Sequence, residues 1–168
     1  TVLEQVATPV LSAGGTFSAS VGVSMTCATD GATIYYTIDG SVPTTASLEL
    51  TSSPVVFGPG IVKVRAMAVK AGTYTPSPAT ATETFKVLNV AKKPTIAPGS
   101  GTLVESAEVS MSCDTSGASI FYTLDPSETP SESSTLYTGP FLISSLGTTT
   151  VKAKAFVVGD DMWAPSPG

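Results

Sequence analysis

The chain of 168 residues contains no histidine, two cysteines and one tryptophan, and only 12% of its residues are charged. Without histidine, the usual general base of a serine or cysteine triad is absent, and two cysteines alone do not make a structural zinc site. No apolar run approaches 18 residues, so no membrane insertion is expected. The net charge of −5 argues against nucleic acid and anionic membranes as partners, because both require basic patches.

Asparagine occurs once, at Asn89, and lacks the Ser or Thr two positions later that N-glycosylation requires. No secretory signal peptide is recognisable, so we expect any such signal to lie outside this segment or to have been removed. Serine and threonine exceed a quarter of the residues, and several lie near prolines. This composition is typical of O-glycosylated segments and also of an ordinary polar surface. The candidate O-glycosylation sites are Thr75, Ser77, Ser131 and Ser133.

One stretch occurs twice and organises the rest of the sequence. Residues 32–40 are ATIYYTIDG, and residues 118–126 are ASIFYTLDP. Successive side chains of a strand point to opposite faces, so Ile34 and Tyr36 fall on one face and Tyr35 falls on the other. Each run ends with an aspartate at a turn. The sequence therefore predicts a half-buried strand that ends in a tight turn, present in two copies.

The segments around this stretch recur in the same order. VKVRAMAV, which starts at Val62, aligns with VKAKAFVV, which starts at Val151, and both begin by alternating apolar and polar residues. About seven short strands per copy, separated by turns, are typical of a β-sandwich. We therefore predict an all-β fold of two tandem immunoglobulin-like or fibronectin-III-like β-sandwich domains. Their expected ranges are residues 7–90 and 91–168, preceded by a strand at residues 1–6.

The two copies stop at different points of the repeat. The first continues into ETFKVL, its predicted last strand, whereas the second stops at Gly168. Residues 1–6, TVLEQV, precede Pro9 as ETFKVL precedes Pro94, so we expect them to complete a neighbouring repeat. Three explanations remain open: a window from a covalent tandem array, donation of a strand to the next subunit, or a trimmed segment. The residues expected to be donated are Val2, Leu3 and Val6.

The two cysteines occupy equivalent places in the two copies. Cys27 and Cys113 each continue the apolar face of a predicted strand. Unpaired cysteine is among the most buried residue types, so we expect two buried free thiols. A disulfide between subunits is the alternative.

Acidic residues give little indication of catalysis. Two carboxylate pairs have the composition of a glycosidase site, but they lie on predicted loops or strand edges, where solvated acids are ordinary. These pairs are Glu105 with Glu108, and Glu128 with Glu132. Asp39 and Asp125 are expected to cap turns rather than to bind calcium, and Asp160–Asp161 is too sparse for a calcium loop. We therefore predict no enzyme activity, metal or cofactor.

Four aromatic residues are candidates for contact with sugars or with neighbouring domains. Tyr35 and Phe121 point to the face opposite Tyr36 and Tyr122, where exposed rings are able to stack on a sugar. The competing explanation is packing across the alkyl stems of lysine and arginine on the next strand. Tyr74 and Trp163 lie beside Pro-rich turns and are expected to serve a contact between domains or a ligand platform.

These motifs carry a family resemblance. GATIYYTIDGSVPT, followed by a Pro-led strand and VKVRAMAV, resembles the C-terminal β-sandwich repeat of chitobiases and β-hexosaminidases, also described as fibronectin-III-associated. The first copy keeps Asp39, Gly40 and Pro43 of the pattern, whereas the second has Pro126 in place of the glycine and one extra residue in the loop. The resemblance covers nearly all of both halves. It implies the sandwich fold and no catalytic residues, because such repeats are appended to many secreted and cell-surface proteins.

Two hypotheses for function follow. The first is a non-catalytic structural tandem repeat of an extracellular fibre or cell-surface protein, whose partners are copies of itself in end-to-end contact. The alternative, implied by the resemblance, is an accessory or carbohydrate-binding module of a secreted glycoside hydrolase, with a polysaccharide as partner. Filaments of the purified chain would favour the first hypothesis, and retention on insoluble polysaccharide would favour the second.

Overall fold

The computed structural model describes residues 3–72, 74–102, 106–144 and 147–168, and in these residues it contains β-strands and no helix. The chain divides into a first unit, Thr1–Leu88, and a second unit, Asn89–Gly168. This confirms the all-β fold of two β-sandwiches predicted from the sequence. Within the described ranges, no helix has the length and apolar character needed to cross a membrane.

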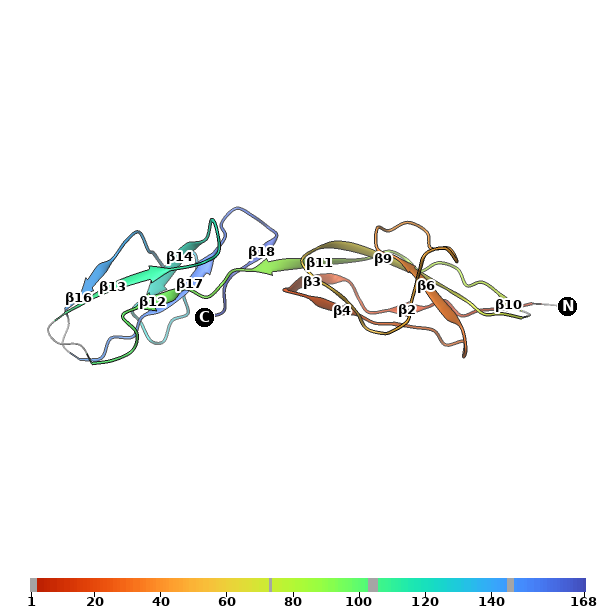
Figure 1. Cartoon of the computed structure of the whole chain (residues 1–168), viewed down its shortest axis with the longest axis horizontal. Coiled ribbons are helices and arrows are strands. Elements are labelled where there is room, and N and C mark those ends of the chain that lie inside the picture. The colour runs from red at the N-terminus through yellow and green to blue at the C-terminus, as the bar shows by residue number, and fades with distance from the viewer. Residues whose placement is uncertain (1–2, 73, 103–105, 145–146) are drawn as a thin grey trace. The chain divides into compact units, whose positions relative to one another are not determined.

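Short strands separated by turns build both units (Figure 1). Those of the first unit are β1 (Glu4–Gln5), β2 (Val10–Leu11), β3 (Gly15–Ser18), β4 (Val21–Val23), β5 (Met25–Thr26), β6 (Thr33–Thr37), β7 (Leu48–Glu49), β8 (Val55–Phe57), β9 (Gly60–Val69), β10 (Tyr74–Thr75) and most of β11 (Glu83–Val90). Those of the second unit are β12 (Thr95–Ala97), β13 (Ala107–Ser112), β14 (Ser119–Thr123), β15 (Thr135–Leu136), β16 (Phe141–Ile143), β17 (Lys152–Phe156) and β18 (Trp163–Ala164).

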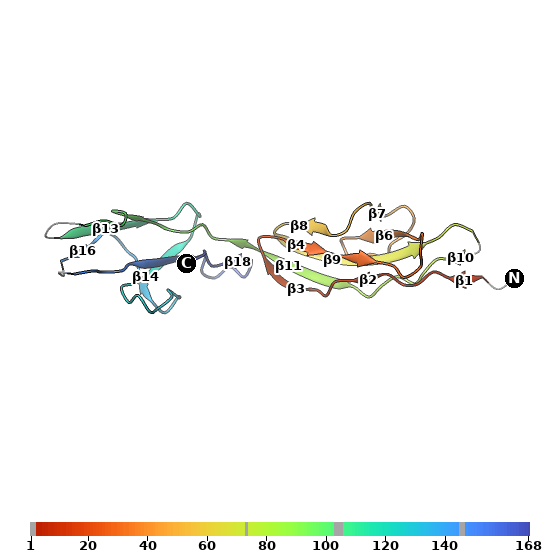
Figure 2. The same cartoon turned by 90° about the horizontal axis from the view of Figure 1, so that it is seen from below.

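The first unit has two layers. In one layer β7, β6, β9 and β11 lie in that order as antiparallel neighbours, and β3 joins the outer edge of β11 in parallel. The other layer contains the antiparallel pairs β2–β5 and β4–β8, of which Figure 2 labels β2, β4 and β8. Strand β1 pairs in parallel with β10. The hydrophobic core lies between the layers.

Alternation along β9 and β11 supplies much of this core. Val64, Ala66 and Ala68 are fully buried, as the sequence pattern predicts, and β11 contributes Phe85 and Val87 from the same layer. The side chains between them face outwards, since the strand period is two. Burying each large apolar side chain contributes about 1.5–3 kcal/mol, so β11 is both a backbone partner of β9 and a principal source of the core.

The second unit repeats this arrangement with fewer strands in one layer. Strands β12, β13 and β16 form one antiparallel layer, and β15, β14 and β17 form the other. Among the described residues its cluster of buried side chains is smaller than that of the first unit and contains Val109, Met111, Ile120 and Ala153. Among the described residues of this unit, no strand pairs with β17 on the side that β11 occupies beside β9.

Strand pairing corrects the alignment of the two copies. Ile34 of β6 lies opposite Ala68, and Ile120 of β14 lies opposite Ala155. Ala155 therefore corresponds to Ala68, so Val151 corresponds to Val64. The sequence alignment of Val151 with Val62 was wrong by two residues, because the loop that follows the strand is longer in the second unit.

Strand β1 pairs within its own unit. Glu4 lies opposite Tyr74, and Val6 is 1% exposed in the core of the first unit. The second unit has the equivalent pairing, of Asn89 at the end of β11 with Trp163 of β18. Leu3 is half exposed and Val2 lies outside the described residues, so donation of this segment to a neighbouring copy stays a prediction.

We predict that Phe85→Ala destabilises the first unit by about 3–5 kcal/mol, because it removes a fully buried ring and leaves a cavity between the layers. Urea unfolding followed by circular dichroism measures the loss. Val56→Ala is the control, since Val56 is 67% exposed and its truncation is expected to change stability by less than about 0.5 kcal/mol. Equal effects of the two substitutions would contradict the role given to Phe85.

Candidate functional site

The turn after the repeated strand is held by an aspartate and a serine in both units. The Oδ1 atom of Asp39 accepts hydrogen bonds from the backbone N of Ser41 at 2.9 Å and from its hydroxyl at 2.6 Å. In the second unit, Oδ1 of Asp125 accepts from the backbone N of Ser127 at 2.7 Å and from its hydroxyl at 2.6 Å. The expectation that these aspartates cap turns is confirmed.

These hydrogen bonds stabilise the charged carboxylates. The side-chain hydrogen bond from Ser41 and then its backbone N–H lower the pKa of Asp39 below its ordinary value of 3.8. Ser127 lowers the pKa of Asp125 in the same way, with a smaller contribution from Lys152. Because the folded pKa is depressed, the stabilisation is present above the unfolded pKa and is lost as the pH falls through the folded value.

We predict that Ser41→Ala raises the pKa of Asp39 towards 3.8, since it removes the largest of the effects that lower it. An NMR titration of the carboxyl carbons measures this change. Asp125 serves as the internal control, because its own serine is untouched. An unchanged Asp39 pKa would show that the hydroxyl does not stabilise the carboxylate.

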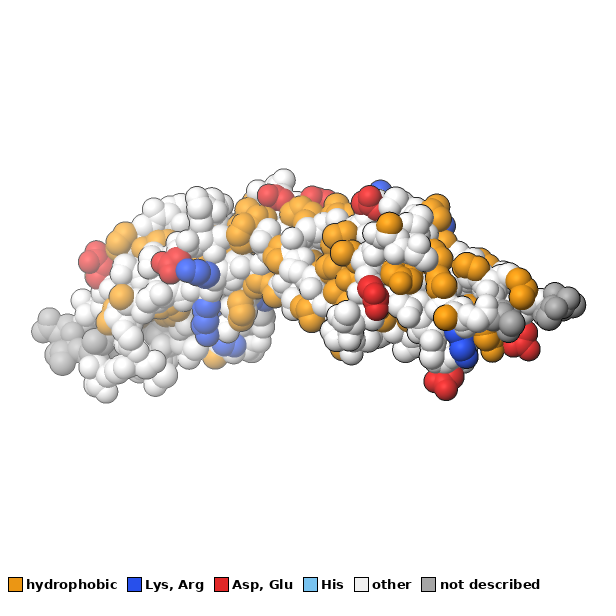
Figure 3. Space-filling view, turned by 45° about the vertical axis from the view of Figure 1, so that its right-hand side comes forward, with side chains coloured by type: hydrophobic (Ala, Val, Ile, Leu, Met, Phe, Trp, Pro, Cys, Tyr) orange, Lys and Arg blue, Asp and Glu red, His pale blue; other side chains and the backbone are white. Residues whose placement is uncertain are grey.

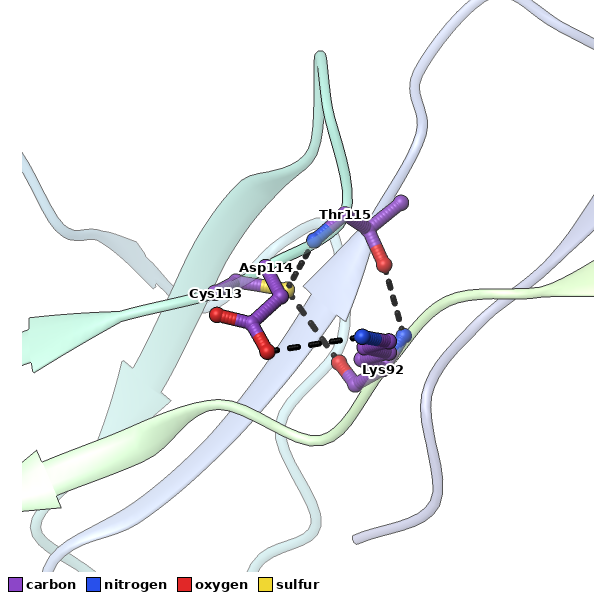
Figure 4. Close-up of polar contacts among 4 residues, drawn as sticks. All are labelled: Lys92, Cys113, Asp114 and Thr115. Carbon is purple, nitrogen blue, oxygen red and sulfur yellow. Dashed lines mark hydrogen bonds and ion pairs between the residues drawn. The ribbon is translucent and has the colours of Figure 1, made fainter.

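Each cysteine belongs to a small set of hydrogen bonds, a polar clamp, that holds the segment entering its unit. Figure 4 shows the clamp of Cys113. In the second unit the backbone N of Lys92 donates to Oγ1 of Thr115 at 2.8 Å, and Sγ of Cys113 donates to the carbonyl of Lys92 at 3.2 Å. The backbone N of Thr115 in turn donates to Sγ of Cys113 at 3.5 Å. The exposed ion pair of Lys92 with Asp114 contributes little, because water screens it.

The first unit has the same clamp. The backbone N of Ala7 donates to Oγ1 of Thr29 at 2.9 Å, and Sγ of Cys27 donates to the carbonyl of Ala7 at 3.3 Å. Both thiols are free and half-buried, which is more exposed than the sequence predicted. Cys27 and Cys113 therefore fix the segment that enters each unit, and the Cys-x-Thr spacing shared by the two copies is the sequence signal of this contact.

We predict that Thr115→Val destabilises the second unit by about 1 kcal/mol, because the Lys92 N–H loses its acceptor. Unfolding in urea, followed by the fluorescence of the single tryptophan Trp163, measures the change within this unit. Thr115→Ser keeps the hydroxyl and is expected to lose less than half as much. Equal losses in the two variants would mean that the methyl group, and not the hydrogen bond, matters.

The rings on the repeated strand are packed against neighbouring side chains. Phe121 makes an edge-to-face contact with Phe156, with ring centroids 5.5 Å apart. Tyr35 is half-buried, and its strand neighbours are Met67 and Glu49. The arrangement favours cross-strand packing over an open row of rings for sugar stacking.

Tyr74 and Trp163 have different surroundings. The ammonium of Lys70 lies 4.7 Å from the ring centroid of Tyr74, a cation–π contact. Trp163 is half-buried and lines a shallow hollow of about 410 Å³ together with Phe156, Glu132 and Asp160. This hollow therefore combines an aromatic surface with carboxylates, the kind of lining by which ligand sites orient polar ligands.

The candidate O-glycosylation sites differ in accessibility. Ser77 is 7% exposed, and its hydroxyl accepts from the backbone N of Ala68 at 2.8 Å and donates to the carbonyl of Pro78 at 2.9 Å. A glycan on Ser77 would break this buried contact. Thr75 is half-buried, whereas Ser131 and Ser133 are exposed and bond to each other through their hydroxyls at 2.8 Å.

The acidic residues of the two candidate pairs have different surroundings. Oε2 of Glu128 accepts from the Thr123 hydroxyl at 3.2 Å, Glu108 is exposed on β13, and Glu105 lies outside the described residues. Residues 3–72, 74–102, 106–144 and 147–168 contain no group of three or more Cys, Asp or Glu that could hold a metal. Charged side chains are scattered on the face seen in Figure 3.

Known proteins resemble this chain in sequence and in structure. The sequence profile of the chitobiase/beta-hexosaminidase C-terminal domain matches residues 12–84 and 98–164, which confirms the resemblance found in the sequence. The solved fibronectin(III)-like modules of CbhA from Clostridium thermocellum are similar at 14% identity, with a TM-score of 0.41, over 95% of this chain and 89% of that chain. No curated protein matches the chain.

Proposed function

Because the chain belongs to the chitobiase/β-hexosaminidase C-terminal domain family, we propose that it is a non-catalytic accessory segment of a secreted, carbohydrate-active protein. Its role is to hold or space other domains as a pair of β-sandwiches. The family name supports this, since it describes a domain found at the C-terminal end of two kinds of glycosidase. Fold alone does not imply function, so the argument also depends on what the side chains do.

One observation carries the proposal: carboxylates and thiols, the side chains most often used in catalysis, form hydrogen bonds to the backbone here. Asp39 and Asp125 cap turns, and Cys27 and Cys113 bind backbone carbonyls. Outward rings such as Phe121 pack on neighbouring side chains. These contacts stabilise the sandwiches, which is what a structural role requires of these side chains.

A second candidate function is glycan binding at the hollow beside Trp163. The half-buried indole and the carboxylates of Glu132 and Asp160 line one surface of the second unit. An aromatic ring with adjacent hydrogen-bond acceptors suits a sugar ring that carries hydroxyl groups.

Assembly of copies into an extracellular fibre is a separate proposal, supported by the internal repeat and tested by imaging filaments of the purified chain.

We predict that the chain does not hydrolyse aryl N-acetylglucosaminides or chitin oligosaccharides, because it only scaffolds other domains. A chromogenic assay measures this, and hydrolysis that co-purifies with the chain would overturn the proposed function.

Pull-down on chitin and cellulose tests the second candidate, glycan binding at the hollow beside Trp163. Retention that Trp163→Ala abolishes and Tyr35→Ala leaves intact would establish glycan binding at the hollow, and absence of retention would leave the spacer role alone.

A further inference from the structure

Aspartate is followed directly by glycine twice in the sequence, at Asp30–Gly31 and at Asp39–Gly40. Both pairs lie in the first unit, one on either side of β6. Because glycine has no side chain, its backbone N reaches the carboxyl carbon of a preceding aspartate with little steric hindrance. Attack at that carbon closes a succinimide ring, and its rate depends on whether the folded chain lets the two atoms meet. The surroundings of each pair therefore decide its reactivity.

Asp39 is held away from this reaction. Its Oδ1 atom accepts from the hydroxyl of Ser41 at 2.6 Å and from the backbone N of Ser41 at 2.9 Å, so the carboxylate is tied to the residue beyond Gly40. The backbone of Asp39 also forms a parallel bridge with Lys63, and a Cβ atom on Gly40 would lie 3.4 Å from Cβ of Lys63. The hydroxyl of Ser41 and then its backbone N–H lower the pKa of Asp39, and an ionised carboxylate is a poor electrophile.

Asp30 lacks these restraints. It lies in a turn that is closed by a hydrogen bond of 3.2 Å from the backbone N of Ala32 to the carbonyl of Thr29, and Gly31 follows it with a φ of +70°. Asp30 and Gly31 are both exposed, and in the described part of the chain the Asp30 carboxylate has no hydrogen bond or ion pair. A Cβ atom on Gly31 would have its nearest neighbour 4.0 Å away, at Cε of Lys70. The carboxyl group is therefore able to rotate towards the backbone N of Gly31.

We propose that Asp30–Gly31 is a modification site, at which the folded chain forms an isoaspartyl linkage that Asp39–Gly40 does not form. The backbone N of Gly31 bonds to Cγ of Asp30, and the carboxyl hydroxyl leaves with the amide proton as water. Water then opens the ring at the main-chain carbonyl, so the chain continues through Cβ and Cγ and the α-carboxylate becomes a side group. The water released in the first step balances the water consumed in the second, so no oxidant or cofactor is required. This inference goes beyond the proposed accessory role and does not depend on it.

Isomerisation at Asp30 disturbs the polar clamp of the first unit. An isoaspartyl residue adds a methylene group to the backbone within the turn that Thr29 and Ala32 close. Oγ1 of Thr29 is also the acceptor for the backbone N of Ala7, at 2.9 Å. We therefore expect the modified chain to lose protection of the Ala7 amide against hydrogen exchange, because the segment that enters the unit is held less firmly.

The second unit has the same turn without the aspartate. The backbone N of Ala118 donates to the carbonyl of Thr115 at 3.2 Å, and Gly117 has a φ of +73°. Ser116 stands where the first unit has Asp30. Asp30→Ser therefore gives a turn sequence that this fold already accepts, and it removes the carboxyl group that the reaction requires.

Incubation of the folded chain in heavy-oxygen water at neutral pH tests the inference. Each ring opening incorporates a heavy oxygen atom, and cleavage after Tyr35 or Tyr36 separates the two pairs for mass spectrometry, which also identifies the isoaspartyl product. In guanidinium chloride we expect both pairs to be labelled at similar rates, because neither is restrained. In the folded chain we expect Asp30 to keep that rate within about threefold and Asp39 to be labelled at least about tenfold more slowly.

Two variants complete the test. Asp30→Ser is expected to abolish labelling of its own peptide and to leave the rate at Asp39 unchanged. Ser41→Ala is expected to accelerate labelling at Asp39 alone, because it removes one of the two hydrogen bonds that restrain the carboxylate. Equal rates for the two pairs in the folded chain would overturn the inference, and so would a folded chain in which Asp30 is protected as strongly as Asp39. Exchange of the Ala7 amide that modification leaves unchanged would overturn the effect on the clamp.

Discussion

The pairing of β11 with β9 is the constraint on which the first sandwich depends. It satisfies the backbone groups along one edge of a layer, and it also brings Phe85 and Val87 between the layers. An edge strand left unpaired exposes a row of hydrogen-bonding groups, and a core left unfilled loses apolar burial. In the first unit, one strand therefore both pairs the edge of β9 and fills the core.

Polar side chains of both units also stabilise the fold, through hydrogen bonds to the backbone. Turns are capped by Asp39 and Asp125, entering segments are clamped by Cys27 and Cys113, and buried strand amides are paired by serines. The hydroxyl of Ser166, for example, accepts from the backbone N of Ala155 at 2.9 Å. Leaving such a buried amide without an acceptor costs about 1–3 kcal/mol, so these polar groups stabilise the fold.

Strand alternation made the architecture predictable from the sequence. The periodicity of Ile34 and Tyr36 and the repeat of this stretch indicated two sandwiches, because burial on one face imposes that pattern. The register of Val151 was not predictable, since VKVRAMAV and VKAKAFVV align well in either of two registers and only pairing with β14 decides between them. The sequence did not predict the hydrogen bonds of Cys27 and Cys113, because their acceptors are backbone carbonyls, which every residue has.

The most direct test of this account is the order in which the two units unfold in urea. The single tryptophan, Trp163, reports the second unit, and far-UV circular dichroism reports both. The account predicts that the tryptophan transition precedes a later circular dichroism transition of the first unit, because among the described residues the first unit has the larger cluster of buried side chains and the longer paired strands. A tryptophan transition that coincides with the final loss of β-structure would contradict it.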